Sequence, residues 1–241
     1  MRVRLVACFL VAVFAAFTSR AAFASALITI NGSPLDAAAL NCSISGDQTI
    51  CRGTNLQGSG FMLSSWEFLF DPDPSVSGAF TVLNLSATTQ TFTIGVGLGV
   101  LPLGSTVSAT GFTGAGTLTD LNGGGATLTD NGISIYTALI DGTAVHTLLD
   151  PPQSYISTPL ASGGPGAPVT IPFSSFGPNI LAQPVNSIIG TQFQFRLTSG
   201  DQVSLPFGFT VTPVAVPESD SLTLLGCGIV CLAAFRRRRA A

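Results

Sequence analysis

The sequence predicts an all-β fold, an antiparallel β-sandwich or jelly roll, on three observations. Apolar residues alternate with polar or small residues in several segments, which is the period of a half-buried strand. Turn signals made of Gly, Asn and Asp recur at a spacing of roughly ten residues. Between the two chain ends, no segment has the apolar period of a helix.

The first clear strand is predicted over residues 91–100. Its alternate positions are apolar and share one face, at Phe92, Ile94, Val96, Leu98 and Val100. A second strand is expected over 133–140, between the turn signals Asp130-Asn131-Gly132 and Asp141-Gly142.

Near the end of the domain the pattern predicts a β-hairpin. Residues 192–197 and 202–211 both alternate, and Ser199-Gly200-Asp201 lies between them. We expect one inward face that carries Phe193, Phe195, Leu197, Val203, Leu205, Phe207, Phe209 and Val211. The preceding stretch, 151–184, contains eight prolines, so we expect a loop-rich segment that covers an edge of the sandwich or is mobile.

The N-terminus predicts a secretory signal helix over residues 1–26. Arg2 and Arg4 precede an apolar region, and Ala24-Ser25-Ala26 has the small residues of a cleavage site, which places the mature start near Leu27. An uncleaved membrane anchor is the alternative. The exported domain is then expected over 27–214.

The five cysteines are distributed over the signal, the exported domain and the C-terminal end of the chain. Cys8 lies in the signal and Cys227 and Cys231 in the C-terminal apolar run, so only Cys42 and Cys51 remain in the exported domain. In an oxidising compartment we expect these two to form a disulfide. Two free thiols are the alternative.

The charge distribution argues against nucleic-acid binding. The chain has no Lys, and residues 27–216 contain only Arg52 and Arg196 against ten acids, a net charge of −8. Such a domain cannot neutralise a phosphate backbone.

The C-terminus predicts a short transmembrane helix over residues 222–235 within a terminal segment, 215–241. As a helix these residues span roughly 21 Å, against a hydrocarbon core of about 30 Å. The four arginines Arg236, Arg237, Arg238 and Arg239 then stay on the cytoplasmic side, so the domain lies outside the inner membrane. The signal peptide predicts the same topology independently.

This tail resembles the PEP-CTERM sorting signal of Gram-negative bacteria: Pro217 and Glu218, then the apolar run, then the terminal arginines. The resemblance implies transient recognition by an exosortase-like membrane protease, cleavage near Pro217, and delivery to the cell surface and its exopolysaccharide. Ser219 departs from the pattern, because the family usually has a second proline there. Residues 66–94 also resemble a strand-turn-strand opening of other PEP-CTERM proteins.

Catalytic motifs are missing from the sequence. It has no G-x-S-x-G, H-E-x-x-H, C-x-x-C or Walker loop, and its one histidine, His146, is expected to be a strand residue. Most aspartates sit beside Gly, Pro or Asn, as they do in turns. Asp71 and Asp73 form either a rigid acidic turn or a weak Ca²⁺ site. We expect no resident metal or cofactor.

The sequence therefore predicts a non-enzymatic exported protein of the cell surface or extracellular matrix, sorted by its tail and associated with exopolysaccharide. A lectin-like carbohydrate-binding module is the alternative, and a secreted glycoside hydrolase with two carboxylates is a further one. Trp66, Tyr136 and Tyr155 could stack on sugars if exposed, although Trp66 alternates with Phe68 and Phe70 and is expected in the core.

Overall fold

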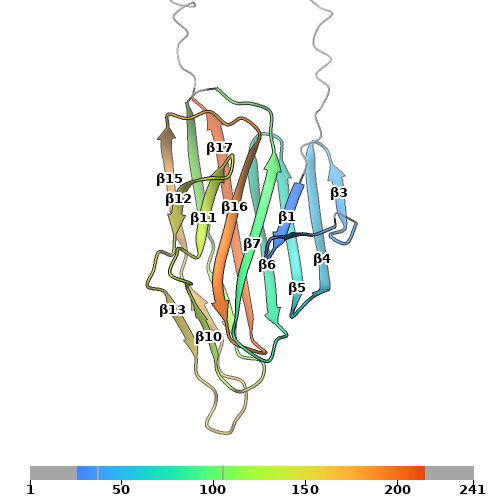
Figure 1. The fold of residues 1–241 in the computed structure, drawn as a ribbon, viewed down its shortest axis with the longest axis vertical. Coiled ribbons are helices and arrows are strands. Elements are labelled where there is room, and N and C mark those ends of the chain that lie inside the picture. The colour runs from blue at the N-terminus through green and yellow to red at the C-terminus, as the bar shows by residue number, and fades with distance from the viewer. Residues whose placement is uncertain (1–25, 37, 105, 215–241) are drawn as a thin grey trace, which may run out of the picture.

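A computed structural model describes residues 26–36, 38–104 and 106–214, which form two antiparallel β-sheets packed face to face as a sandwich (Figure 1). The predicted all-β sandwich is confirmed. The signal helix and the transmembrane helix lie outside the described residues. Within those residues, no helix is long and apolar enough to cross a membrane.

Sheet A has the strand order β12-β11-β16-β7-β1-β2, and the short strands β10 and β13 extend it beside β16. Its strands are β1 (Ala26–Ile30), β2 (Ser33–Pro34), β7 (Gln90–Gly99), β10 (Ala126–Thr129), β11 (Tyr136–Ile140), β12 (Thr143–Leu148), β13 (Ser154–Ser157) and β16 (Ile188–Leu197).

Sheet B has the order β14-β9-β17-β6-β5-β4-β3, and β8 lies beside the second half of β17 with β15 outside it. Its strands are β3 (Cys42–Ser45), β4 (Gln48–Gly58), β5 (Phe61–Asp71), β6 (Ser75–Asn84), β8 (Val107–Thr113), β9 (Gly116–Thr119), β14 (Val169–Ile171), β15 (Ser174–Leu181) and β17 (Gln202–Pro213).

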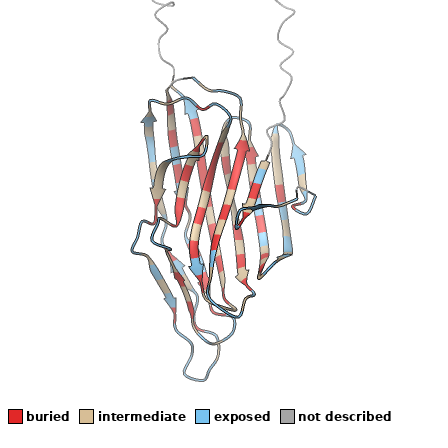
Figure 2. Cartoon of the chain, viewed as in Figure 1, coloured by how far each residue is buried: buried red, intermediate tan, exposed pale blue. Residues whose placement is uncertain are grey.

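The core fills the space between the sheets, and the burial alternates along each central strand (Figure 2). Phe193 of sheet A lies at its centre, with ring centroids 5.0 Å from Phe80 and 5.2 Å from Phe207 of sheet B. Tyr136 is also buried, and its hydroxyl donates a hydrogen bond to the carbonyl of Gly208 at 3.1 Å. The strand predicted over 91–100 is confirmed as β7, which begins one residue earlier, at Gln90, and ends at Gly99.

The predicted hairpin over 192–211 is wrong in its pairing, although its inward face is confirmed. β16 belongs to sheet A and β17 to sheet B, so residues 198–201 cross from one sheet to the other. Phe193, Phe195, Phe207 and Phe209 are all buried, and they point at one core from opposite sides. A hairpin and a crossing produce the same alternation, which is why the pattern could not separate them.

The predicted strand over 133–140 begins later than expected, at Tyr136. Ile133 is 45% exposed, because Asp130 holds the preceding turn by accepting hydrogen bonds from the N–H groups of Gly132 and Gln153. The proline-rich stretch 151–184 contributes β13 to sheet A and β14 and β15 to sheet B, all at sheet edges.

Four connections cross between the sheets at one end of the sandwich, over 85–89, 120–125, 158–168 and 198–201. Asn84 links two of them, since its side-chain amide donates to Leu197 O and its own N–H donates to Asp201 O. Asp120 links the other two by accepting from Gly123 N and Gly166 N. Such bonds satisfy backbone groups that a crossing would otherwise bury unpaired.

Both ends of the described chain lie at the opposite end of the sandwich from these crossings (Figure 1). Ala26 pairs with Leu98 at the start of β1, and Val214 N donates to Thr106 O just after β17. The two segments predicted to meet a membrane therefore attach at the same end of the domain.

Candidate functional site

The predicted sorting residues lie outside the described residues: Pro217, Glu218, Ser219, Arg236, Arg237, Arg238, Arg239 and, at the signal cleavage site, Ala24. Ala26 and Leu27 are described and occupy the first two positions of β1. Leu27 is 45% exposed on the outer face of sheet A, opposite Gly97. A mature chain beginning at Leu27 would keep four of the five β1 residues.

The predicted disulfide between Cys42 and Cys51 is present in the structure. The two residues are direct cross-strand partners in the β3–β4 pair, and Gly46 has the positive φ of 67° that its tight turn requires. Cys51 is fully buried. The bond therefore ties the edge strand β3 to the core.

The turn at Asp71 and Asp73 uses its carboxylates locally. Asp71 accepts hydrogen bonds from Asp73 N at 3.0 Å and from the Gln48 side-chain amide at 2.6 Å. Among residues 26–36, 38–104 and 106–214, no group of three or more His, Cys, Asp or Glu could hold a metal ion. This geometry favours the rigid acidic turn over a Ca²⁺ site.

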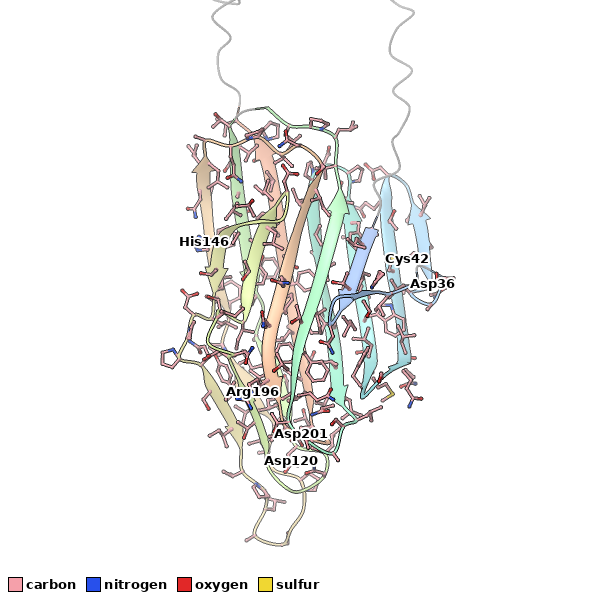
Figure 3. The ribbon with its side chains drawn as sticks, in the orientation of Figure 1. Asp36, Cys42, Asp120, His146, Arg196 and Asp201 are labelled. Carbon is pink, nitrogen blue, oxygen red and sulfur yellow. A yellow bond between two sulfur atoms is a disulfide. The ribbon has the colours of Figure 1, made fainter. Side chains whose placement is uncertain are left out.

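His146 lies in β12, as predicted, and its ring stacks on Phe176 of β15 at 4.0 Å (Figure 3). The contact joins an edge of sheet A to an edge of sheet B, which is a structural role. Trp66 is in the core, as predicted, and its indole N–H donates to Leu40 O at 3.1 Å. Tyr155 is half-buried and donates to the Gln153 side chain.

Several aspartates hold turns. Asp141 begins the two-residue β11–β12 turn with φ 50°, and both of its oxygens accept hydrogen bonds from Asn186 and Ser187. Burial raises the pKa of Asp141, but the hydrogen bonds from residues 186–188 outweigh it and lower the pKa to about 2. Asp141 is therefore ionised at neutral pH and anchors the connection that leads into β16.

Among the residues that the structure describes, Asp120 and Asp201 are the two fully buried carboxylates, and both lie at the crossing end (Figure 3). Burial raises the pKa of Asp120, but four backbone N–H groups outweigh it, so the net shift is downward. The pKa of Asp201 is raised, chiefly by burial, and the Asp120 charge adds to this. One Asp201 oxygen accepts from Thr198, while the other has no hydrogen-bond partner.

This pair does not offer a glycosidase arrangement, because a substrate must reach both carboxyl groups. Asp120 and Asp201 are 0% exposed. Asp120 is occupied by N–H donors from Gly123, Gly125 and Gly166. The pair is better explained as part of the bonding that closes this end of the sandwich.

An exposed aromatic pair, which the sequence analysis missed, lies on the outer face of sheet B. Phe112 of β8 and Phe173, just before β15, are 40% and 61% exposed. Their ring centroids are 6.3 Å apart and their planes differ by 24°. They border a hollow of about 380 Å³ that we call the aromatic hollow, lined mainly by Thr110, Phe112, Phe173, Ser175, Gly208 and Thr210.

One feature of the sequence could have indicated this site: a glycine in the middle of a strand. Gly208 interrupts the outward positions of β17, and a Cβ atom there would lie 2.4 Å from a ring carbon of Phe112. Glycine inside a strand often marks a close approach of another group. The partner, Phe112, is nearly a hundred positions away and could not be identified from the pattern.

A second, smaller hollow of about 180 Å³ lies on the outer face of sheet A. It is lined by a row of cross-strand partners: Leu27 of β1, Gly97 of β7, Gly190 of β16 and Leu139 of β11. The Ile188 side chain already packs over Gly97, with a contact of 3.1 Å to the position of a Cβ atom. This hollow is smaller and more apolar than the aromatic hollow.

No protein-family model matches this sequence, and no curated protein matches it at a significant level.

Proposed function

We propose that this protein is a non-catalytic, exported component of the cell surface or extracellular matrix, delivered there as an exosortase-type substrate. The observation that carries the proposal is the position of the chain ends. Ala26 and Val214 lie at one end of the sandwich, so the signal and the PEP-CTERM-like tail can both engage the inner membrane while the domain extends away from it (Figure 1).

The disulfide supports export. Disulfides persist in oxidising compartments and are rare in the cytosol. The Cys42–Cys51 bond joins the exposed edge strand β3 to β4, in addition to the backbone pairing of the two strands.

Exopolysaccharide is the partner that this location suggests, and a carbohydrate-binding role is favoured by a specific observation, the aromatic hollow. A secreted hydrolase is the weaker alternative, because the buried carboxylates Asp120 and Asp201 have no surface that a substrate could reach. The low positive charge of the domain argues against nucleic acid as a partner.

Intact-mass analysis of the protein recovered from its native cells tests both processing steps together. We expect a chain that begins near Leu27 and ends near Glu218, with the Cys42–Cys51 disulfide intact. Surface protein that still ends at Ala241 would contradict sorting by cleavage and leave a membrane-anchored domain.

Two variants separate retention from cleavage. Replacing Arg236, Arg237, Arg238 and Arg239 with Ser removes the charges that hold the segment in the membrane, so both retention and processing decrease. Glu218→Ala leaves insertion intact and impairs processing alone, whereas Asp220→Ala, two positions away, serves as the matched control. Equal effects of the two acidic substitutions would contradict recognition at Pro217-Glu218.

A further inference from the structure

Gly208, Phe112 and Phe173 are arranged so that both aromatic rings of the hollow keep exposed surface. Gly208 has its open side on the outer face of sheet B, and the Phe112 ring packs against it there. Because glycine has no side chain, the ring can lie close to the β17 backbone. Phe173 lies beside it with nearly parallel planes, at a separation typical of offset rings. Both rings therefore keep surface for a further partner.

Hydroxyl groups surround these rings. Thr110 and Thr210 are cross-strand partners on the outer face, and Ser175 is the register partner of Phe112 on β15. Each hydroxyl can donate one hydrogen bond and accept two. Ser75 continues the row, since its hydroxyl lies 3.0 Å from that of Thr210.

The hollow presents rings and hydroxyls and no charge. None of the six residues named for it is ionisable, and its volume of about 380 Å³ lies within the range of about 300–1,000 Å³ for small-molecule sites. The surrounding domain, residues 27–216, carries a net charge of −8. An anionic ligand would therefore be repelled by the domain without finding a cation in the hollow.

We propose that the aromatic hollow binds a pyranose ring of a neutral polysaccharide, with the C–H face of the sugar on Phe112 and Phe173 and its hydroxyls on Thr110, Thr210 and Ser175. Aromatic faces carry partial negative charge and attract such C–H groups, while sugar hydroxyls match the donors and acceptors around the rings. This inference rests on the proposed function: it names the binding site and the ligand class for the carbohydrate-binding role.

A purely structural role would explain only part of this arrangement. Covering Gly208 accounts for Phe112, because an aromatic ring can shield a glycine in a strand. It does not account for Phe173, which is 61% exposed and also lines the hollow. The two explanations differ in what removal of Phe173 does to ligand binding.

Affinity gel electrophoresis of the full chain in mild detergent tests the proposal, with amylose, dextran, mannan or soluble cellulose in the gel and alginate as the anionic comparison. We expect at least one neutral polymer to retard the protein, and alginate to retard it less. Phe112→Ala and Phe173→Ala each weaken the affinity for that polymer, measured from the retardation, by about tenfold. Ile156→Ala, a 58% exposed residue on sheet A, leaves it unchanged.

Gly208→Ala provides a second variant that keeps both rings. The added methyl group would collide with Phe112 and displace it, so retardation decreases although no ring is lost. Lack of retardation by every neutral polymer, preference for alginate, or full binding by Phe173→Ala would overturn the proposal. Release of new reducing ends from a bound polymer would instead overturn the non-catalytic function, so the two failures are distinguishable.

Discussion

Replacement of Phe193 by Ala tests the two-sheet core at its centre. Phe193 is fully buried in β16 and contacts Phe80, Phe207 and Tyr136 at ring-centroid distances of 5.0, 5.2 and 5.4 Å. A buried Phe→Ala change costs about 3–5 kcal/mol from lost transfer energy and the remaining cavity. Because three rings contact Phe193 from both sheets, we expect the upper part of that range.

The expected loss is large against the whole stability of a domain, about 5–15 kcal/mol. Urea unfolding followed by Trp66 fluorescence measures it, since Trp66 is the one tryptophan of the chain and is 5% exposed. For a denaturant slope of about 3 kcal/mol per molar, a loss in the upper part of the range lowers the midpoint by about 1.3–1.7 M.

The neighbouring residue supplies the control. Gln194 lies in the same strand with its side chain on the outer face, so Gln194→Ala changes stability by about 0.5 kcal/mol or less. Phe193→Leu keeps an apolar side chain in the core and is expected to cost less than Phe193→Ala. Equal losses for Phe193→Ala and Gln194→Ala would refute the assigned register, because a one-residue slip exchanges the two faces.

Three further predictions use the same unfolding assay. Under oxidising conditions, Cys42→Ser is less stable than the native protein by about 2–3 kcal/mol, whereas after reduction of the native protein the two differ little. The same stability difference in both conditions would exclude a role for the disulfide. The pKa of Asp141 falls from 3.8 to about 2 on folding, so its contribution is present above pH 3.8 and is lost as the pH falls toward 2; Asp141→Asn should lack this acid-side slope. The pKa of Asp201 is instead raised from 3.8, so its contribution is lost as the pH rises through the folded value; an unchanged slope in Asp201→Asn would contradict this.

The alternation of apolar residues predicted which side chains are buried, and it did so because one face of each sheet meets the core. Phe92, Phe195 and Phe209 are buried as expected. The same alternation carries no information about which sheet a strand joins. The β16–β17 crossing depends instead on Asn84, which bonds to Leu197 O and Asp201 O from a distant part of the sequence.

The aromatic hollow lay outside what the pattern could predict for a related reason. Phe112 occupies an outward position of β8, where an isolated apolar residue is common and needs no explanation. Phe112 forms a site only together with Gly208 and Phe173. The pairing of β8 with β17 brings Gly208 beside it, and the chain just before β15 brings Phe173 beside it. Tyr136, a candidate for sugar stacking on sequence grounds, lies instead on an inward face and is buried.

The position of the aromatic hollow also constrains how a polymer could meet the domain. Both ends of the described chain lie at one end of the sandwich and the four crossings lie at the other, whereas β8 and β17 run between them. The hollow therefore lies on the side of the domain, on the outer face of sheet B. A polysaccharide chain could pass along that face without inserting an end, because the site is open and its row of hydroxyls continues from Thr210 to Ser75. If residues 215–241 tether the domain, such a face remains accessible while the tether is intact, so binding to polymer would not have to wait for cleavage of the tail.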